Sequence, residues 1–248
     1  MYKAHFLAPT PRFGRQNNRL PVGHQQRSPY YWWWAYLRRN NTYLECCENG
    51  GKGPLSALYS DFGDVRDDDF HKWWTSGHRG ALLFAEPPLE THLTELTQPS
   101  EWNPAWAEDD VMVIAVPLRV SKRSLIQAFR KALDQRHIGK RGRPSISRMR
   151  SRAKYELERN YTIQNLQTAL AVYDVWLENS TKPKAERLVL WEIAKQLGIN
   201  RAAIKQAESN LRGEKYIGRN TLAATISRYV KQAKETIKNT SSGRFPLF

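Results

Sequence analysis

Three side chains near position 200 carry hydrogen-bonding groups that match the edges of nucleic-acid bases. Arg201 and Lys205 can donate to O6 and N7 of guanine, and Gln206 fits N6 and N7 of adenine. We expect these residues and Ser209 to lie on the outward face of one helix. Lys195, a few residues upstream, is placed to contact backbone phosphates.

The segment that must position these side chains, residues 190–207, has the pattern of two short helices joined by a tight turn. Ala194 falls where two helices cross closely, and Gly198 falls where the turn needs a positive φ, which glycine adopts without steric cost. Asn200 can cap the second helix by accepting from the backbone of residue 202 or 203. The apolar side chains that the two helices would bury against each other are Ile193, Leu197, Ile199 and Ile204. The pattern resembles the helix-turn-helix, which places its second helix in the major groove of DNA; an ordinary helical hairpin is the alternative.

A second group of cations lies between residues 119 and 155, where thirteen Lys and Arg residues face only one acid, Asp134. Bound phosphates would relieve their mutual repulsion. Within this stretch, residues 139–144 resemble an AT-hook, whose Arg-Gly-Arg-Pro core lies in the minor groove of A·T-rich DNA. The resemblance implies that Arg141 and Arg143 lie along the groove floor; a solvated basic linker is the alternative. The other cations that we expect to contact nucleic acid are Arg148, Arg150, Arg152, Arg219 and Arg228.

The charge of the chain is divided unevenly. The 248 residues carry a net charge of +15, and the pI is about 9.9, as expected of a protein that binds polyanions. Residues 1–118 have a net charge of −3 and residues 119–248 a net charge of +18. The sequence therefore predicts nucleic-acid contact by the second half, with double-stranded DNA as the first expectation and RNA or single-stranded DNA as alternatives.

Five consecutive aromatic residues, 30–34, wrap the whole circumference of a predicted helix. Some of their rings must face away from any single core, so three interpretations stay open. The helix is buried on several sides, or it binds a protein partner or a second copy, or its rings stack on unpaired bases. Tyr31, Trp32 and Trp33 are the candidate partner-binding residues.

A signature of the form W-x-[FY]-L-R-R-N-x-x-Y overlaps the end of the aromatic run. Its residues in this chain are Trp34, Tyr36, Leu37, Arg38, Arg39, Asn40 and Tyr43. The signature resembles the start of a proteobacterial domain family that is described as transcriptional-regulator-like and occurs on mobile elements. The flanking residues do not belong to that pattern. The resemblance implies a bacterial or phage origin.

The periodicity of apolar residues predicts a mainly α fold with a small α+β portion. A buried strand is expected over 111–116, paired with 82–85, and a helix is expected after a Ser121 cap. Longer helices are expected over 28–48, 162–178, 184–197, 201–211 and 221–238, with a turn or short wing over 211–219. The expected organisation is a flexible basic arm (1–27), an aromatic-rich α+β domain (28–136), a basic hinge (137–153), a helical helix-turn-helix domain (154–240) and a flexible tail (241–248).

No motif in the sequence predicts catalysis. Residues 67–69 are three aspartates that a helix cap explains better than a metal site, and Cys46 and Cys47 lack zinc-ligand spacing with the histidines. We therefore expect a protein that is not an enzyme and that needs no metal or cofactor. No signal peptide and no membrane-length apolar run occur, which predicts a cytoplasmic protein.

These features predict a sequence-preferring double-stranded DNA-binding protein that regulates transcription or a mobile element. The alternative is a non-catalytic nucleic-acid-binding subunit of a larger nucleoprotein assembly. The expected protein contact, with a partner or a second copy, is through the aromatic first half.

Overall fold

The computed structural model describes residues 4–87, 95–102, 112–136, 151–158 and 161–248. Contacts divide the chain into two compact units. We call them the main unit, which comprises the described residues of Met1–Pro87 and Ser151–Phe248, and the inserted unit, which comprises those of Pro88–Arg150. The described residues are mostly helical with one two-stranded antiparallel sheet, so the prediction of a mainly α fold is confirmed.

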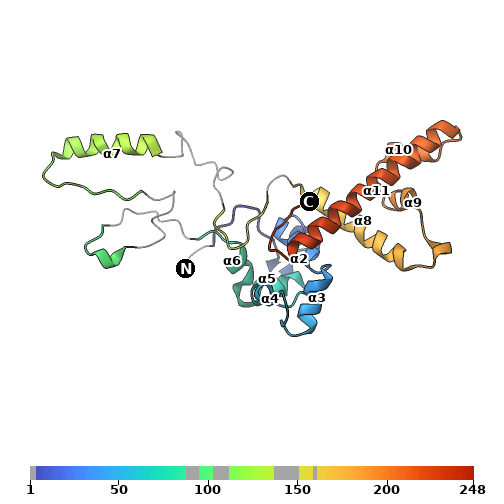
Figure 1. Cartoon of the computed structure of the whole chain (residues 1–248), viewed down its shortest axis with the longest axis horizontal. Coiled ribbons are helices and arrows are strands. Elements are labelled where there is room, and N and C mark those ends of the chain that lie inside the picture. The colour runs from blue at the N-terminus through green and yellow to red at the C-terminus, as the bar shows by residue number, and fades with distance from the viewer. Residues whose placement is uncertain (1–3, 88–94, 103–111, 137–150, 159–160) are drawn as a thin grey trace. The chain divides into compact units, whose positions relative to one another are not determined.

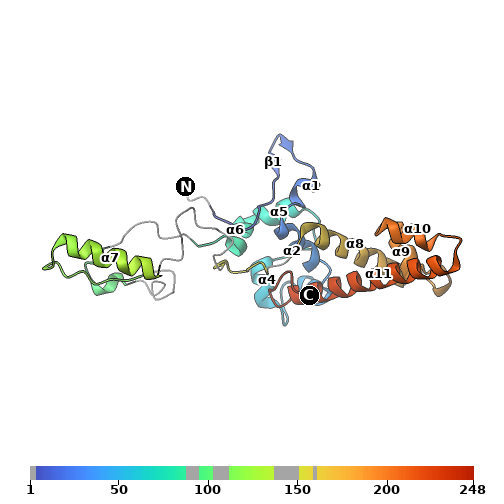
Figure 2. The same ribbon diagram turned by 90° about the horizontal axis from the view of Figure 1, so that it is seen from above.

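The first half of the main unit is a set of short helices preceded by a small hairpin (Figures 1 and 2). In the hairpin, Gly14 pairs with Arg19 and Arg15 with Asn18. The single helix expected over 28–48 is broken at residues 38–40 into two. The elements are β1 (Gly14–Arg15), β2 (Asn18–Arg19), α1 (Val22–Gln25), α2 (Pro29–Leu37), α3 (Asn41–Glu48), α4 (Ser56–Phe62), α5 (Phe70–Thr75), η1 (Ser76–His78) and α6 (Arg79–Phe84).

The second half of the main unit is built on two longer helices, α8 (Ile163–Thr181) and α11 (Arg212–Thr240). Between them lie the short elements η5 (Lys184–Glu186), α9 (Leu190–Gln196) and α10 (Arg201–Ala207). Figure 1 shows α10 and α9 beside the N-terminal part of α11. Thr162 caps α8 by accepting from the backbone of Asn165 at 3.1 Å.

Helix α2 lies in an aromatic core to which both halves of the main unit contribute. Trp33 is fully buried, and its ring packs on Phe84 at 5.2 Å and on Phe245 at 5.3 Å between centroids. Leu166 of α8 and Ala233 of α11 belong to the same buried cluster. Hydrophobic burial of this size supplies the main driving force for joining the halves.

The core decides between the interpretations of the aromatic run. Trp32 and Trp33 are buried, and Trp32 donates from its ring nitrogen to the carbonyl of Gln26 at 2.8 Å. Tyr31 is half-buried against Trp32, Trp34 and Phe70. The assignment of Trp32 and Trp33 as partner-binding residues is therefore wrong, because both rings are buried inside the chain, whereas Tyr31 keeps part of its surface exposed.

Polar side chains of the signature fasten α2 and α3 to the second half of the main unit. Arg39 donates to both carboxylate oxygens of Asp174 on α8, at 3.0 and 2.7 Å. The hydroxyl of Tyr36 donates to the carbonyl of Leu166 at 2.9 Å, and burial raises its pKa, so that it stays a donor. Asn40 caps α3 and donates to the carbonyl of Ile237 on α11 at 2.8 Å.

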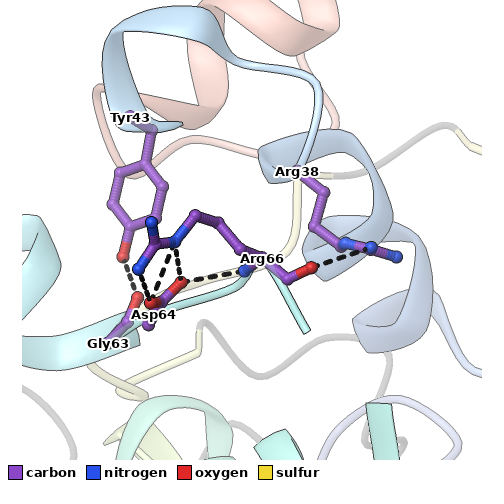
Figure 3. A network of polar contacts seen from close by, with 5 residues as sticks. All are labelled: Arg38, Tyr43, Gly63, Asp64 and Arg66. Carbon is purple, nitrogen blue, oxygen red and sulfur yellow. Dashed lines mark hydrogen bonds and ion pairs between the residues drawn. The ribbon is translucent and has the colours of Figure 1, made fainter. Parts of the chain in front are cut away.

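The remaining signature residues secure the segment after α4 (Figure 3). The Tyr43 hydroxyl donates to the carbonyl of Gly63 at 2.7 Å, and Arg38 donates to the carbonyl of Arg66 at 3.2 Å. Hydrogen bonds from Arg66 lower the pKa of Asp64 below its ordinary value. Burial lowers the pKa of Arg38, whose guanidinium lies 4.7 Å from the Trp34 ring centroid. The signature residues thus have structural roles in this chain.

The expected domain boundaries differ from the observed packing. The two expected domains share one core, because α2 packs on α8 and α11. The arm is not free: Phe13 packs on Phe70, and the backbone of Glu86 donates to His5 at 2.8 Å. The tail is anchored by the buried ring of Phe245.

The inserted unit contains α7 (Lys122–Arg136) and the short helix η2 (Pro99–Glu101). The side chain of Ser121 accepts from the backbone of Ser124 at 3.2 Å, as predicted for a helix cap. The strand expected over 111–116 is not formed by its described residues 112–116, and residues 82–84 belong to α6 instead. No helix in the described part of the chain is long and apolar enough to cross a membrane.

We predict that Phe245→Ala lowers the free energy of unfolding by about 3–5 kcal/mol, because it removes a fully buried ring that touches Trp33 and Tyr36. Urea unfolding of the full chain measures this. Phe248→Ala, three residues further, is the matched control, because Phe248 is 55% exposed and its loss costs about 0.5 kcal/mol or less. Equal unfolding midpoints for the two variants would contradict the assignment of the C-terminus to the core.

Candidate nucleic-acid interface

Helices α9 and α10 pack against α8 and α11. Ile193 and Ala194 of α9 are fully buried, and Ala203 and Ala207 of α10 are nearly so. They pack in one cluster with buried residues of the longer helices. The cluster members from α8 and α11 are Val172, Leu222, Ile226 and Val230.

The turn between α9 and α10 has the predicted geometry. Gly198 has φ +65°, and the Asn200 side chain accepts from the backbone of Ala203 at 3.2 Å. Ile199 donates to the carbonyl of Ala194 at 2.9 Å, and Gly198 donates to Lys195 at 3.1 Å. This pair of bonds is the Schellman arrangement that ends a helix on a left-handed glycine.

The approach of α10 to α11 depends on a glycine that the sequence patterns did not single out. A Cβ built on Gly218 would lie 2.3 Å from the backbone nitrogen of Ala207 and 2.8 Å from the carbonyl oxygen of Ala203. Because only backbone atoms line this contact, no side chain can move aside to admit a larger residue. Gly218 therefore fixes the closest approach of the two helices.

The start of α9 is held by a buried amide on α8. Asn179 accepts from the backbone nitrogen of Leu188 at 2.8 Å and donates to the Leu188 carbonyl at 2.9 Å. Glu192 in the first turn of α9 accepts from the backbone of Val189 at 3.0 Å. The helix expected over 184–197 therefore begins at Leu190, because residues 187–189 are extended and pinned to α8.

The outward face of α10 carries the predicted base-reading residues. Arg201 and Lys205 are exposed on the side opposite the buried Ala203 and Ala207, and Gln206 is exposed at the edge of that buried face. None of these three side chains bonds or forms an ion pair with another described residue. They remain available to a ligand.

Two predicted contacts are already used within the chain. Lys195 pairs with Glu208 at 2.5 Å. The Ser209 hydroxyl donates to Glu214 at 2.6 Å and accepts from the backbone of Leu211 at 3.2 Å. Ser209 is therefore part of the connection between α10 and α11, and its assignment to base reading is not supported by this geometry.

The predicted phosphate contacts differ in their surroundings. Arg219 is half-buried, with its guanidinium 4.4 Å from the Trp191 ring centroid. Arg228 is exposed, 5.8 Å from the Tyr229 ring centroid. The AT-hook-like segment with Arg141 and Arg143, together with Arg148 and Arg150, lies outside the described residues. At the end of the expected hinge, the backbone of Arg152 donates to Glu86 at 2.7 Å, so this end is fastened to the main unit.

The segment expected to form a turn or wing, residues 211–219, is instead the start of α11. Gly213 and Gly218 both take a helical conformation here. The buried residues at every fourth position of α11 were the available signal, since Gly218, Leu222 and Ile226 continue one face. The exposed residues of this first part of α11 that sequence reasoning missed are Arg212, Lys215, Tyr216 and Ile217.

Comparisons with protein-family models, with curated proteins and with solved structures found no match to this chain. Among the described residues, no group of three or more His, Cys, Asp or Glu side chains is placed to hold a metal ion.

We predict that Gly218→Ala separates α10 from α11 and lowers the free energy of unfolding by about 1–3 kcal/mol, because the new methyl group meets backbone. Thermal or urea unfolding followed by circular dichroism measures the loss. Gly213→Ala is the matched control on the same helix, since nothing lies within 4 Å of its Cβ position. This control should be neutral or stabilising by up to about 1 kcal/mol. Equal effects at the two glycines would contradict the close approach.

Proposed function

We propose that this chain binds double-stranded DNA with sequence preference, as a regulator of transcription or of a mobile element does. The proposal rests on the exposed face of α10, where the side chains of Arg201, Lys205 and Gln206 bond to no other described residue. The opposite face of α10 is buried on α11, so the backbone that carries these side chains is rigid. A short helix presented in this way after a glycine turn fits the major groove.

The distribution of charge also supports binding to duplex DNA. The second half of the sequence carries the excess of cations, and Arg228 and Lys231 extend the exposed basic surface along α11. Cations of this kind contact phosphates and fix the register of the protein without reading sequence. Bidentate contacts from α10 would then supply the preference between base pairs.

A second candidate function follows from the inserted unit. Helix α7 has an apolar stripe whose members Ile126 and Phe129 are 42% and 37% exposed, and none of its described residues is buried. Its cations are Lys122, Arg123, Arg130, Lys131 and Arg136. An exposed basic amphipathic helix favours a role in a larger nucleoprotein assembly, where a partner would cover the stripe.

We predict that Lys205→Ala and Gln206→Ala each reduce the ratio of specific to random-duplex affinity by a factor that corresponds to about 1–3 kcal/mol. Affinity for random duplex should survive, because the other cations remain. The measurement is selection of duplexes from a random library, followed by titration of the selected and a scrambled duplex at two salt concentrations. Lys52→Ala is the control, since it removes one exposed cation from the loop between α3 and α4.

The outcomes separate the two candidate functions. An unchanged ratio in Lys52→Ala with a reduced ratio in Lys205→Ala supports base reading by α10. The absence of any duplex preference in the native chain, or equal ratios in all variants, would contradict it. That result would favour the assembly subunit, in which α9 and α10 are a packed hairpin only.

A further inference from the structure

A shallow hollow, open to solvent over most of its extent, lies on the first turns of α11. The residues that line it are Arg212, Gly213, Lys215, Tyr216 and Arg219. It is separate from the outward face of α10, and none of its residues belongs to the base-reading set. The lining combines cations with an aromatic ring, and this combination points to a ligand with both phosphate and a flat apolar part.

The described residues that line the hollow carry an excess of positive charge. Three of its five lining residues are cations, and no carboxylate lines it. The Glu208 carboxylate is paired with Lys195, whereas Glu214 accepts from the Ser209 hydroxyl and keeps its negative charge. Arg212 and Lys215 are exposed and form no ion pair with any other described residue. An anionic ligand would therefore form ion pairs with two cations that are not paired with any other described residue.

One cation of the hollow is held in a fixed position. The Arg219 guanidinium lies over the Trp191 ring at 4.4 Å, and its Nε is shielded from solvent without a hydrogen-bond partner among the described residues. Stacking on a ring leaves the in-plane donors of a guanidinium unblocked, so the terminal nitrogens of Arg219 can bind a phosphate oxygen even though Nε is shielded. The side chain is thus positioned before any ligand arrives.

The aromatic part of the hollow is exposed. Tyr216 is 69% exposed, and Ile217 beside it is 58% exposed. A tyrosine ring in this position is available to stack on a nucleic-acid base. Any of the bases can stack in this way, because each has a π face. A paired base inside a duplex stack does not offer that face, so the fit is to an unpaired nucleotide.

We propose that this hollow binds an unpaired nucleotide of a single-stranded nucleic acid. The base stacks on Tyr216, and the flanking phosphates bind Arg212, Lys215 and Arg219. This site is additional to duplex reading by α10 and does not require it. It gives the chain a means to bind a single-stranded segment, whether DNA or RNA.

The test is fluorescence anisotropy of the full chain with labelled oligothymidylate, oligouridylate and an abasic oligomer of the same length, each about 12 nucleotides. The native chain should bind both base-carrying oligomers more tightly than the abasic one. Tyr216→Ala should weaken the base-carrying oligomers about 5- to 150-fold and leave the abasic oligomer unchanged. Tyr216→Phe should keep the preference, because the ring face remains. Comparison of the thymidylate and uridylate arms distinguishes DNA from RNA as the ligand.

Two controls make the outcome decisive. Ile217→Ala removes a neighbouring exposed apolar side chain and should leave the preference for bases intact. Lys205→Ala should reduce duplex discrimination and leave the preference for base-carrying over abasic oligomers intact, so that the single-strand proposal and the α10 proposal fail independently of each other. Equal binding of the abasic and base-carrying oligomers by the native chain, or full retention of the preference in Tyr216→Ala, would overturn the proposal. Displacement of oligothymidylate by polyglutamate as effectively as by unlabelled oligothymidylate would also overturn it.

Discussion

The burial of α2 is the constraint on which the rest of the main unit depends. Its rings pack on the short helices of the first half and on the C-terminal Phe245, and its polar ends are fastened to the longer helices. Arg39 with Asp174 fixes α8, while Asn40 fixes the end of α11. A half-exposed ion pair such as Arg39 with Asp174 adds little stability by itself, so its main effect is on the placement of α8.

The candidate interface follows from that constraint. Helices α8 and α11 extend from the aromatic core to a second buried cluster, where they hold α9 and α10. The small residues Ala203, Ala207 and Gly218 let α10 approach α11 closely. Close packing of backbone on backbone restricts the movement of α10 relative to α11. Base reading requires this restriction, because hydrogen bonds to base edges form only in a fixed geometry. The exposed cations of α10 and of the first turns of α11 are therefore presented by one rigid support.

The parts predicted from sequence were those that local rules determine. Gly198, Asn200 and Ala194 behave as expected because a tight turn and a helix crossing restrict their residue types over a few positions. The packing of the two halves on each other was not predictable. Trp33 contacts Phe245, which is far away in the sequence, and the periodicity of apolar residues indicates only local structure. The expected strand failed because an apolar run alone does not supply a pairing partner, and Val113 and Val116 are about half exposed. At the interface, the exposure of Arg201, Lys205 and Gln206 was predicted. The hydrogen bond of Ser209 and the ion pair of Lys195 were not, because they depend on where α11 begins and on the position of Glu208.

If α10 lies against the bases of a duplex, a photoreactive group placed on this helix must cross-link to those bases. The chain's own cysteines, Cys46 and Cys47, are buried, so Ala202→Cys on the exposed part of α10 and Lys52→Cys each offer a single exposed thiol for a photoreactive label without removing a proposed base contact. With a duplex selected by the native chain, label at position 202 should cross-link to bases inside the selected sequence, and label at position 52 should not. Equal cross-linking from both positions, or cross-linking from position 202 that is the same with a scrambled duplex, would show that α10 does not lie against the bases.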